Sequence, residues 1–200
     1  YTADEIPNSF EEEMRGLAKK YGIWLLPGSV FEKNDGKIYN TASVINPDGE
    51  IVTRYRKMFP FYPYETGVTG GNQFLIFDIP HVGRFGLTIC YDMWFPETTR
   101  QITSQGVEVL LHPVLTGTTD RDAELAIARA TAVQFQCYVI DINGLSAGGV
   151  GRSCIFDPSA TMLYQAAGQE EMFPLEIDLQ RVRRQRETGF NGLGQVLKSF

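Results

Sequence analysis

Three residue types in this chain could together perform acyl transfer: a thiol, an ammonium and a carboxylate. Cys90 follows an apolar run in "GRFGLTICYDMWFPE", at the point where a buried strand would end. Lys57 lies in "YRKMFPFYPYE", which closes on Glu65. A thiolate can attack a carbonyl carbon, an ammonium can stabilise the thiolate and then the oxyanion, and a carboxylate can move protons or fix the geometry. A strand end would hold such a nucleophile firmly and leave it open to a substrate.

Each of these residues also has a simpler interpretation. Most cysteines outside disulfides are small core hydrophobes, and most lysines and glutamates are surface residues. Other hydrolytic chemistries find little support. A Ser-His-Asp triad is not indicated, because the chain has only two histidines, His81 and His112, and no Gly-x-Ser-x-Gly motif. A Cys–His pair is an alternative that the sequence leaves open. The spacing pairs Cys-x-x-Cys and His-x-x-x-His do not occur, which argues against a zinc site.

Composition narrows the class of protein. The 200 residues are 43% hydrophobic and 21% charged, which is typical of one globular domain. The net charge of −6 argues against a nucleic-acid or anionic-membrane partner, and no apolar run is long enough to span a bilayer. Three scattered cysteines, Cys90, Cys137 and Cys154, fit thiols in a reducing compartment, so we expect a cytoplasmic protein.

The chemistry needs elements to position it, and the pattern predicts strands alternating with helices. A helix over 9–22 would be capped by Ser9, with Glu12 in a capping-box position, and stopped by Gly22. The expected strands are 23–31, a hairpin over 37–59 that turns at Pro47-Asp48-Gly49, then 73–79, 84–90, 107–113, 137–144, 153–158, 161–166 and 172–179. Further helices are expected over 96–106, 119–135 and 180–187.

Many strands with few helices favour two sheets with helices outside. In the helix 119–135, the apolar residues at i, i+3 and i+4 spacing predict the buried face: Ala123, Ala126, Ile127, Ala130 and Val133. The basic helix 180–187 is expected to be a solvated face or an interface. The predicted fold class is therefore α/β, a four-layer α-β-β-α sandwich forming a single domain over 1–200.

Several motifs together resemble the nitrilase superfamily, the carbon–nitrogen hydrolases. "YRKMFPFYPYE" is similar to the family's lysine motif, and "GLTICYDMWFPE" is similar to its cysteine motif, including the Phe-Pro-Glu that opens the next helix. "AKKYGIWLLPGS", "ARATAVQFQCYVIDING" and "GRSCIFDP" occur in the order that the family shows. The resemblance covers nearly the whole chain, and it turns the interpretation of Cys90 from core residue to nucleophile.

The resemblance implies a role for each matching position. Cys90 would form a thioester, Lys57 would stabilise the tetrahedral oxyanion with the backbone N–H of Tyr91 as a second donor, and Glu65 would match the glutamate that amidase-type members place near the substrate. It also implies the α-β-β-α sandwich, no metal or organic cofactor, and a homo-oligomer. The expected substrate is a small linear amide or an N-carbamoyl compound.

Substrate contacts are less sharply indicated. Tyr64 and Trp94 lie close to the two motifs and could form part of an apolar pocket wall, although core packing accounts for them equally well. His112 ends a strand in "LLHPV" and could contribute to substrate binding.

One departure from the family pattern concerns the general base. The family's base is a glutamate on an early strand before the segment matching "LLPG", whereas here only loop and helix are expected before Ile23. Glu11, Glu12 and Glu13 are more simply a solvated first helical turn. We therefore expect the sandwich to be incomplete at its N-terminus. Two alternatives stay open: a nitrilase acting on a nitrile, and a non-catalytic remnant or assembly subunit that lacks the base.

Overall fold

The structure is a computed structural model in which residues 3–193 are described. The chain divides into two compact units, Tyr1–Leu75 and Ile76–Phe200, and each is described by itself. The expectation that residues 1–200 form a single domain stays a prediction.

The first unit opens with helix α1, Ser9–Tyr21. The expected N-cap at Ser9 is one residue too late, because Asn8 has the extended backbone of a cap and its side chain accepts from the Glu11 N–H at 3.0 Å. Gly22 ends the helix as predicted, with a left-handed φ of 62° that allows its N–H to reach carbonyls of the last turn.

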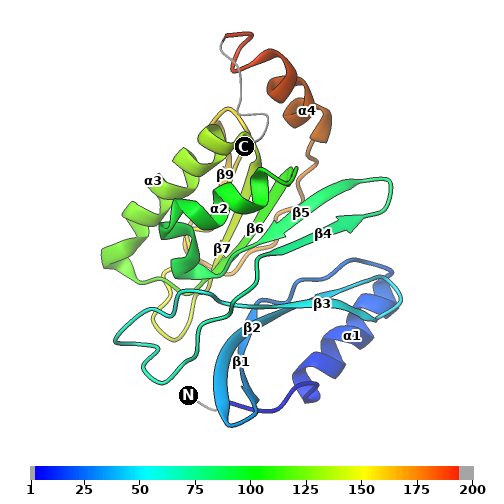
Figure 1. Cartoon of the computed structure of the whole chain (residues 1–200), viewed down its shortest axis with the longest axis vertical. Coiled ribbons are helices and arrows are strands. Elements are labelled where there is room, and N and C mark those ends of the chain that lie inside the picture. Colours follow the sequence, from blue (N-terminus) through cyan, green and yellow to red (C-terminus); the bar gives the residue numbers. More distant parts are fainter. Residues whose placement is uncertain (1–2, 194–200) are drawn as a thin grey trace. The chain divides into compact units, whose positions relative to one another are not determined.

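Three antiparallel strands follow in the order β1-β2-β3: β1 Ser29–Asn34, β2 Lys37–Ile45 and β3 Ile51–Arg56 (Figure 1). The hairpin predicted over 37–59 is confirmed, with Ala42 opposite Tyr55. The strand predicted over 23–31 is wrong in its first half. There Leu25 forms a single bridge with Ile45, and Pro27 and Gly28, with its φ of 98°, delay the regular strand until Ser29.

Successive side chains of β3 point to opposite faces of the first unit's sheet. Arg54 and Arg56 point to the face that binds Glu11 of α1 and Glu32 of β1, with N–O distances of 2.7 and 2.5 Å. Tyr55 points to the opposite face. Lys57 follows the strand and continues this alternation, because its N–H still donates to the Asn40 carbonyl of β2 at 2.8 Å. Ion pairs on one face of the sheet thus leave the other face for the lysine.

The second unit is built on a six-stranded sheet in the order β4-β5-β6-β7-β8-β9 (Figure 1). Its strands are β4 Leu75–Ile79, β5 Gly83–Leu87, β6 Val109–Val114, β7 Tyr138–Asn143, β8 Cys154–Phe156 and β9 Met162–Gln165. Strands β5, β6 and β7 are parallel neighbours, whereas β7-β8 and β8-β9 pair antiparallel. The carboxyl ends of β5, β6 and β7 therefore meet at one edge of the sheet.

Helices α2, Pro96–Thr103, and α3, Thr118–Phe135, cover this sheet. Their shared core contains Ile102, Ala128 and Ala132 against Leu110 and Val139 of the sheet. The buried face predicted for α3 is only partly correct: Ile127 packs against the core, and Ala130 and Val133 are half-buried. Ala123 and Ala126 are exposed, and the buried positions of the helix are Arg121, Glu124, Ala128, Thr131 and Ala132. An ion pair within this face satisfies the two charges, which hydrophobic periodicity cannot detect.

The predicted basic helix forms as α4, Leu179–Thr188. It is more than a solvated face. Arg183 pairs with Glu108 at 2.6 Å, and Arg186 donates to the carbonyls of Val107 and Gln136. The strand predicted over 172–179 is wrong, because residues 172–178 are irregular and Asp178 serves as the N-cap of α4.

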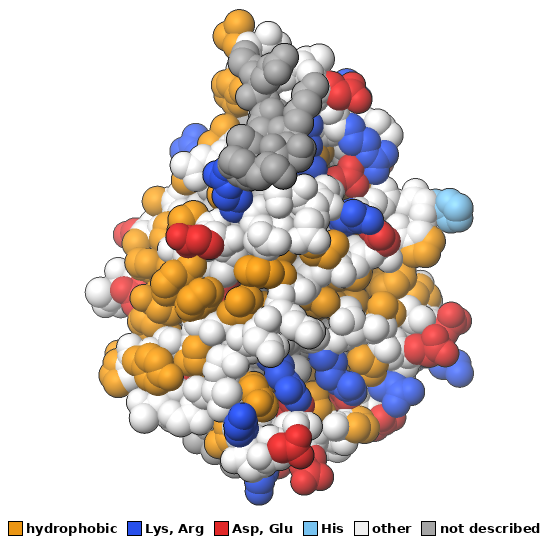
Figure 2. Space-filling view, viewed as in Figure 1, with side chains coloured by type: hydrophobic (Ala, Val, Ile, Leu, Met, Phe, Trp, Pro, Cys, Tyr) orange, Lys and Arg blue, Asp and Glu red, His pale blue; other side chains and the backbone are white. Residues whose placement is uncertain are grey.

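The α/β fold class, with sheets flanked by helices, is confirmed. Among residues 3–193, no helix combines the length and apolar character needed to cross a membrane. Acidic and basic side chains are intermixed over the viewed face, with apolar side chains between them (Figure 2).

Candidate active site

Cys90 lies just beyond the carboxyl end of β5. It opens a short 3-10 helix, η1, Cys90–Trp94, and has a φ of 49°. A non-glycine residue in this left-handed region is uncommon, and such backbones concentrate at functional sites. The thiol is half-buried. The structure therefore places the predicted nucleophile at a sharp strand-to-helix turn.

The turn at Cys90 is fixed by a buried carboxylate. Asp92 accepts the Ile89 N–H at 2.9 Å, and its own N–H donates to the Ile89 carbonyl at 3.1 Å. Thr98 of α2 then donates to the Asp92 carbonyl at 2.8 Å. Asp92 was not singled out in the sequence. It occupies the third position after Ile89, the N-cap of η1, where an acidic side chain can accept from the N–H of the cap residue.

Aromatic rings accompany the cysteine. Tyr91 and Trp94, both in η1, have ring centroids 5.8 Å apart, and Tyr91 meets Phe95 edge-on. Trp94 is 36% exposed, so part of its ring is open to a ligand. The Tyr91 N–H lies in the first turn of η1, next to Cys90. Its role as an oxyanion donor stays a prediction.

Lys57 and Glu65 form a buried ion pair in the first unit. The Lys57 Nζ lies 2.5 Å from Glu65 Oε2, and the lysine is 2% exposed. Glu65 Oε2 also accepts the Phe61 N–H at 2.6 Å, and Oε1 accepts from Asn40 Nδ2 at 2.8 Å. Three donors on one carboxylate fix its orientation, so Glu65 is placed to hold Lys57 in position. The surface interpretation of both residues is wrong. Asn40, in β2, is a site residue that no motif indicated.

The weaker substrate-contact candidates differ in environment. Tyr64, on the loop after Lys57, is 67% exposed and stacks on Phe61 with a centroid separation of 5.5 Å. His112 is buried in β6, and its Nδ1 lies 2.8 Å from the Thr88 Oγ1 between β5 and Cys90. His112 is thus placed to fix the strand end that carries the nucleophile. Substrate contacts by Tyr64, Trp94 and His112 stay predictions.

The structure groups the candidates in two sets. Lys57, Tyr64 and Glu65 belong to the first unit; Cys90, Tyr91, Trp94 and His112 belong to the second. In the first set, Lys57, Tyr64 and Glu65 follow β3 on one loop. In the second set, Cys90, Tyr91 and Trp94 lie on η1, and His112 contacts Thr88 just before Cys90.

The other two cysteines have a different environment from Cys90. Cys137 and Cys154 are fully buried, and burial raises the pKa of the Cys137 thiol to about 12 and that of Cys154 further still. Both thiols stay protonated near neutral pH, so neither is suited to nucleophilic attack.

The three acidic residues of α1 are not equivalent. Glu12 and Glu13 are exposed as predicted, but Glu11 is buried and accepts from Ser43 and Arg54. Burial raises the pKa of Glu11, but the hydrogen bonds from Arg54 and Ser43 and the charge of Arg54 outweigh it and hold this pKa below its usual value. Because Glu11 lies on the face of Arg54, and not on the face of Tyr55, it ties α1 to the sheet.

Comparison with known proteins agrees with this fold and these motifs. Residues 1–187 match the family described as carbon-nitrogen hydrolase. The chain is 30% identical to the omega-amidase NIT2 of Mus musculus, covering 92% of this chain and 72% of that protein. It is also 30% identical to the 2-oxoglutaramate amidase of Bacillus subtilis (strain 168), covering 93% and 74%.

Two solved structures share the fold. Nit3 of Saccharomyces cerevisiae, described as a member of branch 10 of the nitrilase superfamily, superposes with a TM-score of 0.84 at 28% identity, over 94% of this chain and 72% of that one. The carbon-nitrogen hydrolase of Helicobacter pylori G27 gives 0.80 at 30% identity, over 89% and 70%. With the match over residues 1–187, these similarities establish that the chain belongs to the carbon–nitrogen hydrolase family, the nitrilase superfamily.

Proposed function

We propose that this chain hydrolyses a small linear amide through a thioester on Cys90, with Lys57 stabilising the oxyanion and Glu65 positioning Lys57. The enzyme class itself is not in question: the chain is an amidase-type carbon–nitrogen hydrolase, as its sequence predicts. The observation that carries the proposal is the placement of Cys90, half-buried at the end of β5 in a left-handed turn held by Asp92.

The first half of the reaction forms the thioester. The Cys90 sulfur bonds to the amide carbon, and the carbonyl electron pair moves to the oxygen. The Lys57 ammonium and the Tyr91 N–H stabilise the charge that develops there. The carbon–nitrogen bond then breaks, and the leaving nitrogen departs as ammonia or an amine with the proton that the thiol gave up. Water hydrolyses the thioester to the acid and restores the thiol.

The proposal requires Lys57 of the first unit and Cys90 of the second to act on one substrate. An ammonium that is already buried and fixed by Glu65 needs no reorganisation when the oxyanion forms, which is the main advantage of such a site. We assign none of Glu11, Glu12 and Glu13 as the general base, because Glu11 is buried against Arg54 and the other two are exposed on α1.

The proposed substrate class is based on the names of the similar proteins. Their names describe an omega-amidase and a 2-oxoglutaramate amidase. We therefore propose the terminal amide of a short acid, with 2-oxoglutaramate as the first compound to test. Aromatic side chains at Tyr91 and Trp94 favour testing longer aliphatic and aromatic amides beside it. The predictions of a cytoplasmic location and of a homo-oligomer are retained as part of this proposal.

A matched panel of amides, N-carbamoyl amines and nitriles tests the proposed function. Ammonia or amine release should occur with at least one amide, and Cys90→Ala should abolish it. Cys137→Ala is the control, because it removes a buried thiol elsewhere in the second unit. Turnover of nitriles alone would replace the amidase assignment by a nitrilase, and turnover that survives Cys90→Ala would refute the proposed nucleophile.

A further inference from the structure

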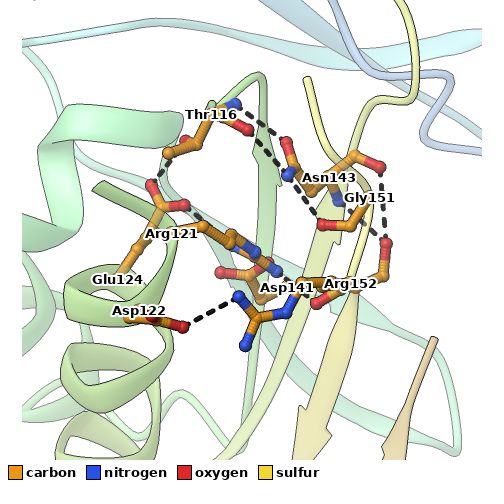
Figure 3. Close-up of polar contacts among 9 residues, drawn as sticks. Thr116, Arg121, Asp122, Glu124, Asp141, Asn143, Gly151 and Arg152 are labelled. Atoms are coloured by element: carbon orange, nitrogen blue, oxygen red, sulfur yellow. Dashed lines mark hydrogen bonds and ion pairs between the residues drawn. The ribbon is translucent and has the colours of Figure 1, made fainter. Parts of the chain in front are cut away.

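A buried cluster of charges lies at the same edge of the sheet as Cys90. Arg121 of α3, which is 0% exposed, donates to Glu124 at 2.8 Å and to Asp141 of β7 at 2.7 Å (Figure 3). Two carboxylates thus share one guanidinium. Burying such a group is costly, and breaking it leaves an uncompensated buried charge, so its presence calls for a role beyond filling the core.

The cluster is connected to both loops at this edge. Arg121 also donates to the Arg152 carbonyl at 2.7 Å, and Glu124 accepts from the Thr116 hydroxyl at 3.0 Å. Asn143 donates to the carbonyls of Thr116 and Gly151 at 3.0 and 2.7 Å, and its side-chain oxygen accepts the Thr116 N–H (Figure 3). Loop 115–117 after β6 and loop 144–153 after β7 are therefore held by the same few side chains.

A row of buried residues links this cluster to the nucleophile. His112 is the register partner of Asp141, and Cys154 is the partner on the other side. His112 lies against Thr88, which precedes Cys90 by two residues. Since β5, β6 and β7 are parallel, both loops emerge at the edge where Cys90 lies, and substrates of parallel sheets bind beyond the carboxyl ends of the strands.

We propose that Arg121, Glu124 and Asp141 form a clamp that holds loops 115–117 and 144–153 in the conformation that binds the acyl part of the substrate. They are positioning residues, because they act through the loop backbone. This inference rests on the proposed function for its substrate, but the order of the loops can be measured without one.

Loop 144–153 needs such a clamp because its own sequence does not fix it. Ala147 and Arg152 have positive φ values of 52° and 60°, and Gly151 has 65°, where a Cβ would come within 2.6 Å of the Leu145 side chain. A segment with several residues in these sparsely populated backbone regions persists only when its surroundings hold it.

Two variants separate the clamp from general stability. Arg121→Met removes all three donor contacts at similar volume. Asp141→Asn keeps the shape and removes the charge that this carboxylate carries above its pKa of about 7, so the variants are compared with the wild type at pH 8. Asp122→Asn is the matched control, because it removes an ion pair between α3 and Arg152 of the same loop that is exposed and should therefore contribute little to holding the loop. Arg121→Lys keeps the positive charge, so loop 144–153 should exchange more slowly in this variant than in Arg121→Met.

Hydrogen exchange of the loop amides is the direct readout, with amide kinetics as the second. We expect exchange in loop 144–153 to rise at least tenfold in both variants, with α4 unchanged, and KM to rise more than kcat falls. Asp122→Asn should stay within twofold of the wild type. If Arg121→Met does not fold, Asp141→Asn carries the test.

Two results would overturn the clamp: loop exchange that stays at the wild-type rate in a folded variant, or exchange that rises equally over the whole chain. A wild-type enzyme that hydrolyses no amide would refute the proposed function instead, and the exchange data would still decide whether the clamp exists.

Discussion

At the scale of the residue, the site depends on charged side chains that are buried and fixed. Lys57 is held by Glu65, Glu65 by Asn40 and a backbone N–H, and the Cys90 turn by Asp92. Such preorganisation lets a charge act on a transition state without reorganising first. It also makes each partner costly to remove, because the remaining charge stays buried.

Glu65→Gln tests this cost. The glutamine keeps the size of the side chain but leaves the Lys57 ammonium buried without its counter-charge, so we expect a loss of about 3 kcal/mol in the free energy of unfolding. Urea denaturation measures it. Asp78→Asn, which removes the exposed partner of Arg84, is the control and should leave stability unchanged. A Glu65→Gln variant as stable as the control would show that the ion pair is not formed.

Lys57→Met tests the oxyanion role. The apolar chain fills the same space without the ammonium, so kcat/KM for an amide should fall by about a hundredfold to a thousandfold. Steady-state kinetics measure the fall, with circular dichroism to verify the fold. Full activity in a folded Lys57→Met enzyme would remove Lys57 from the mechanism.

At the scale of the element, the site is assembled from strand ends and the caps that follow them. Strand β5 delivers Cys90, η1 turns the chain at once, and α2 is tied to η1 by Thr98. The neighbouring ends of β6 and β7 are joined by Asn143 and by the charges around Arg121. The polar residues of this edge thus maintain its geometry.

Asp92→Ala removes the cap of the cysteine turn. We expect a loss of about 1–2 kcal/mol in stability, by analogy with helix caps, together with a fall in kcat because Cys90 loses its fixed backbone. Asp178→Ala, which removes the cap of α4, is the matched control. It should lower stability without changing kcat. Equal kinetic effects from both variants would mean that the turn at Cys90 has no special role.

The shared guanidinium predicts a pH dependence of stability. Complete burial, together with the neighbouring Glu124 carboxylate, outweighs the attraction of Arg121 and raises the pKa of Asp141 to about 7. His112 of β6 and Cys154 of β8 flank Asp141 in the sheet. Between pH 4 and 7 the folded protein retains a proton that the unfolded chain releases, so this group lowers stability as the pH rises through that window.

Asp141→Asn should remove this contribution. The free energy of unfolding of the variant minus that of the wild type should therefore increase from pH 4 to pH 7, on the order of a few kcal/mol. Urea titrations across this range measure the difference. A difference that is constant or falls with pH would contradict the assigned protonation of Asp141.

At the scale of the whole molecule, the proposed mechanism joins the two units, because Lys57 belongs to one and Cys90 to the other. The chemistry therefore predicts an energetic coupling between residues that are far apart in the sequence. A nearby ammonium favours the thiolate form of a cysteine, and the thiolate is the form that is alkylated.

Alkylation of Cys90 by iodoacetamide, an uncharged reagent, measures that coupling. We expect Lys57→Met to slow the reaction by at least tenfold near neutral pH. Lys33→Met, which removes an exposed lysine of the same unit, should leave the rate unchanged. Equal alkylation rates in the wild type and Lys57→Met would mean that the two residues do not share a site.

The sequence predicted the larger elements well, because hydrophobic alternation, turn residues and helix stops are local signals. Strands β2 to β9 and the four α-helices found among residues 3–193 appear where they were expected, within a few residues. The failures have physical causes. Residues 23–31 and 172–179 are apolar enough for strands, but the first is delayed by Pro27 and Gly28, and the second leads into a helix cap.

Local sequence patterns could not predict which side chains pair with each other. Lys57 and Glu65 were identified through motifs, whereas Asn40 joins them only through the pairing of β2 with β3. The buried face of α3 was predicted only in part because Arg121 and Glu124 satisfy each other inside the fold, and periodicity scores both as surface residues. Such contacts depend on which strands become neighbours.

The thioester on Cys90 is the central claim, and partitioning to hydroxylamine tests it most directly. Two amides that share an acyl group but differ in the leaving amine are incubated with the enzyme and hydroxylamine, and the ratio of hydroxamate to acid is measured. A common thioester predicts the same ratio from both amides, with no product from Cys90→Ala. A ratio that changes with the leaving amine, or product formation by Cys90→Ala, would contradict the account.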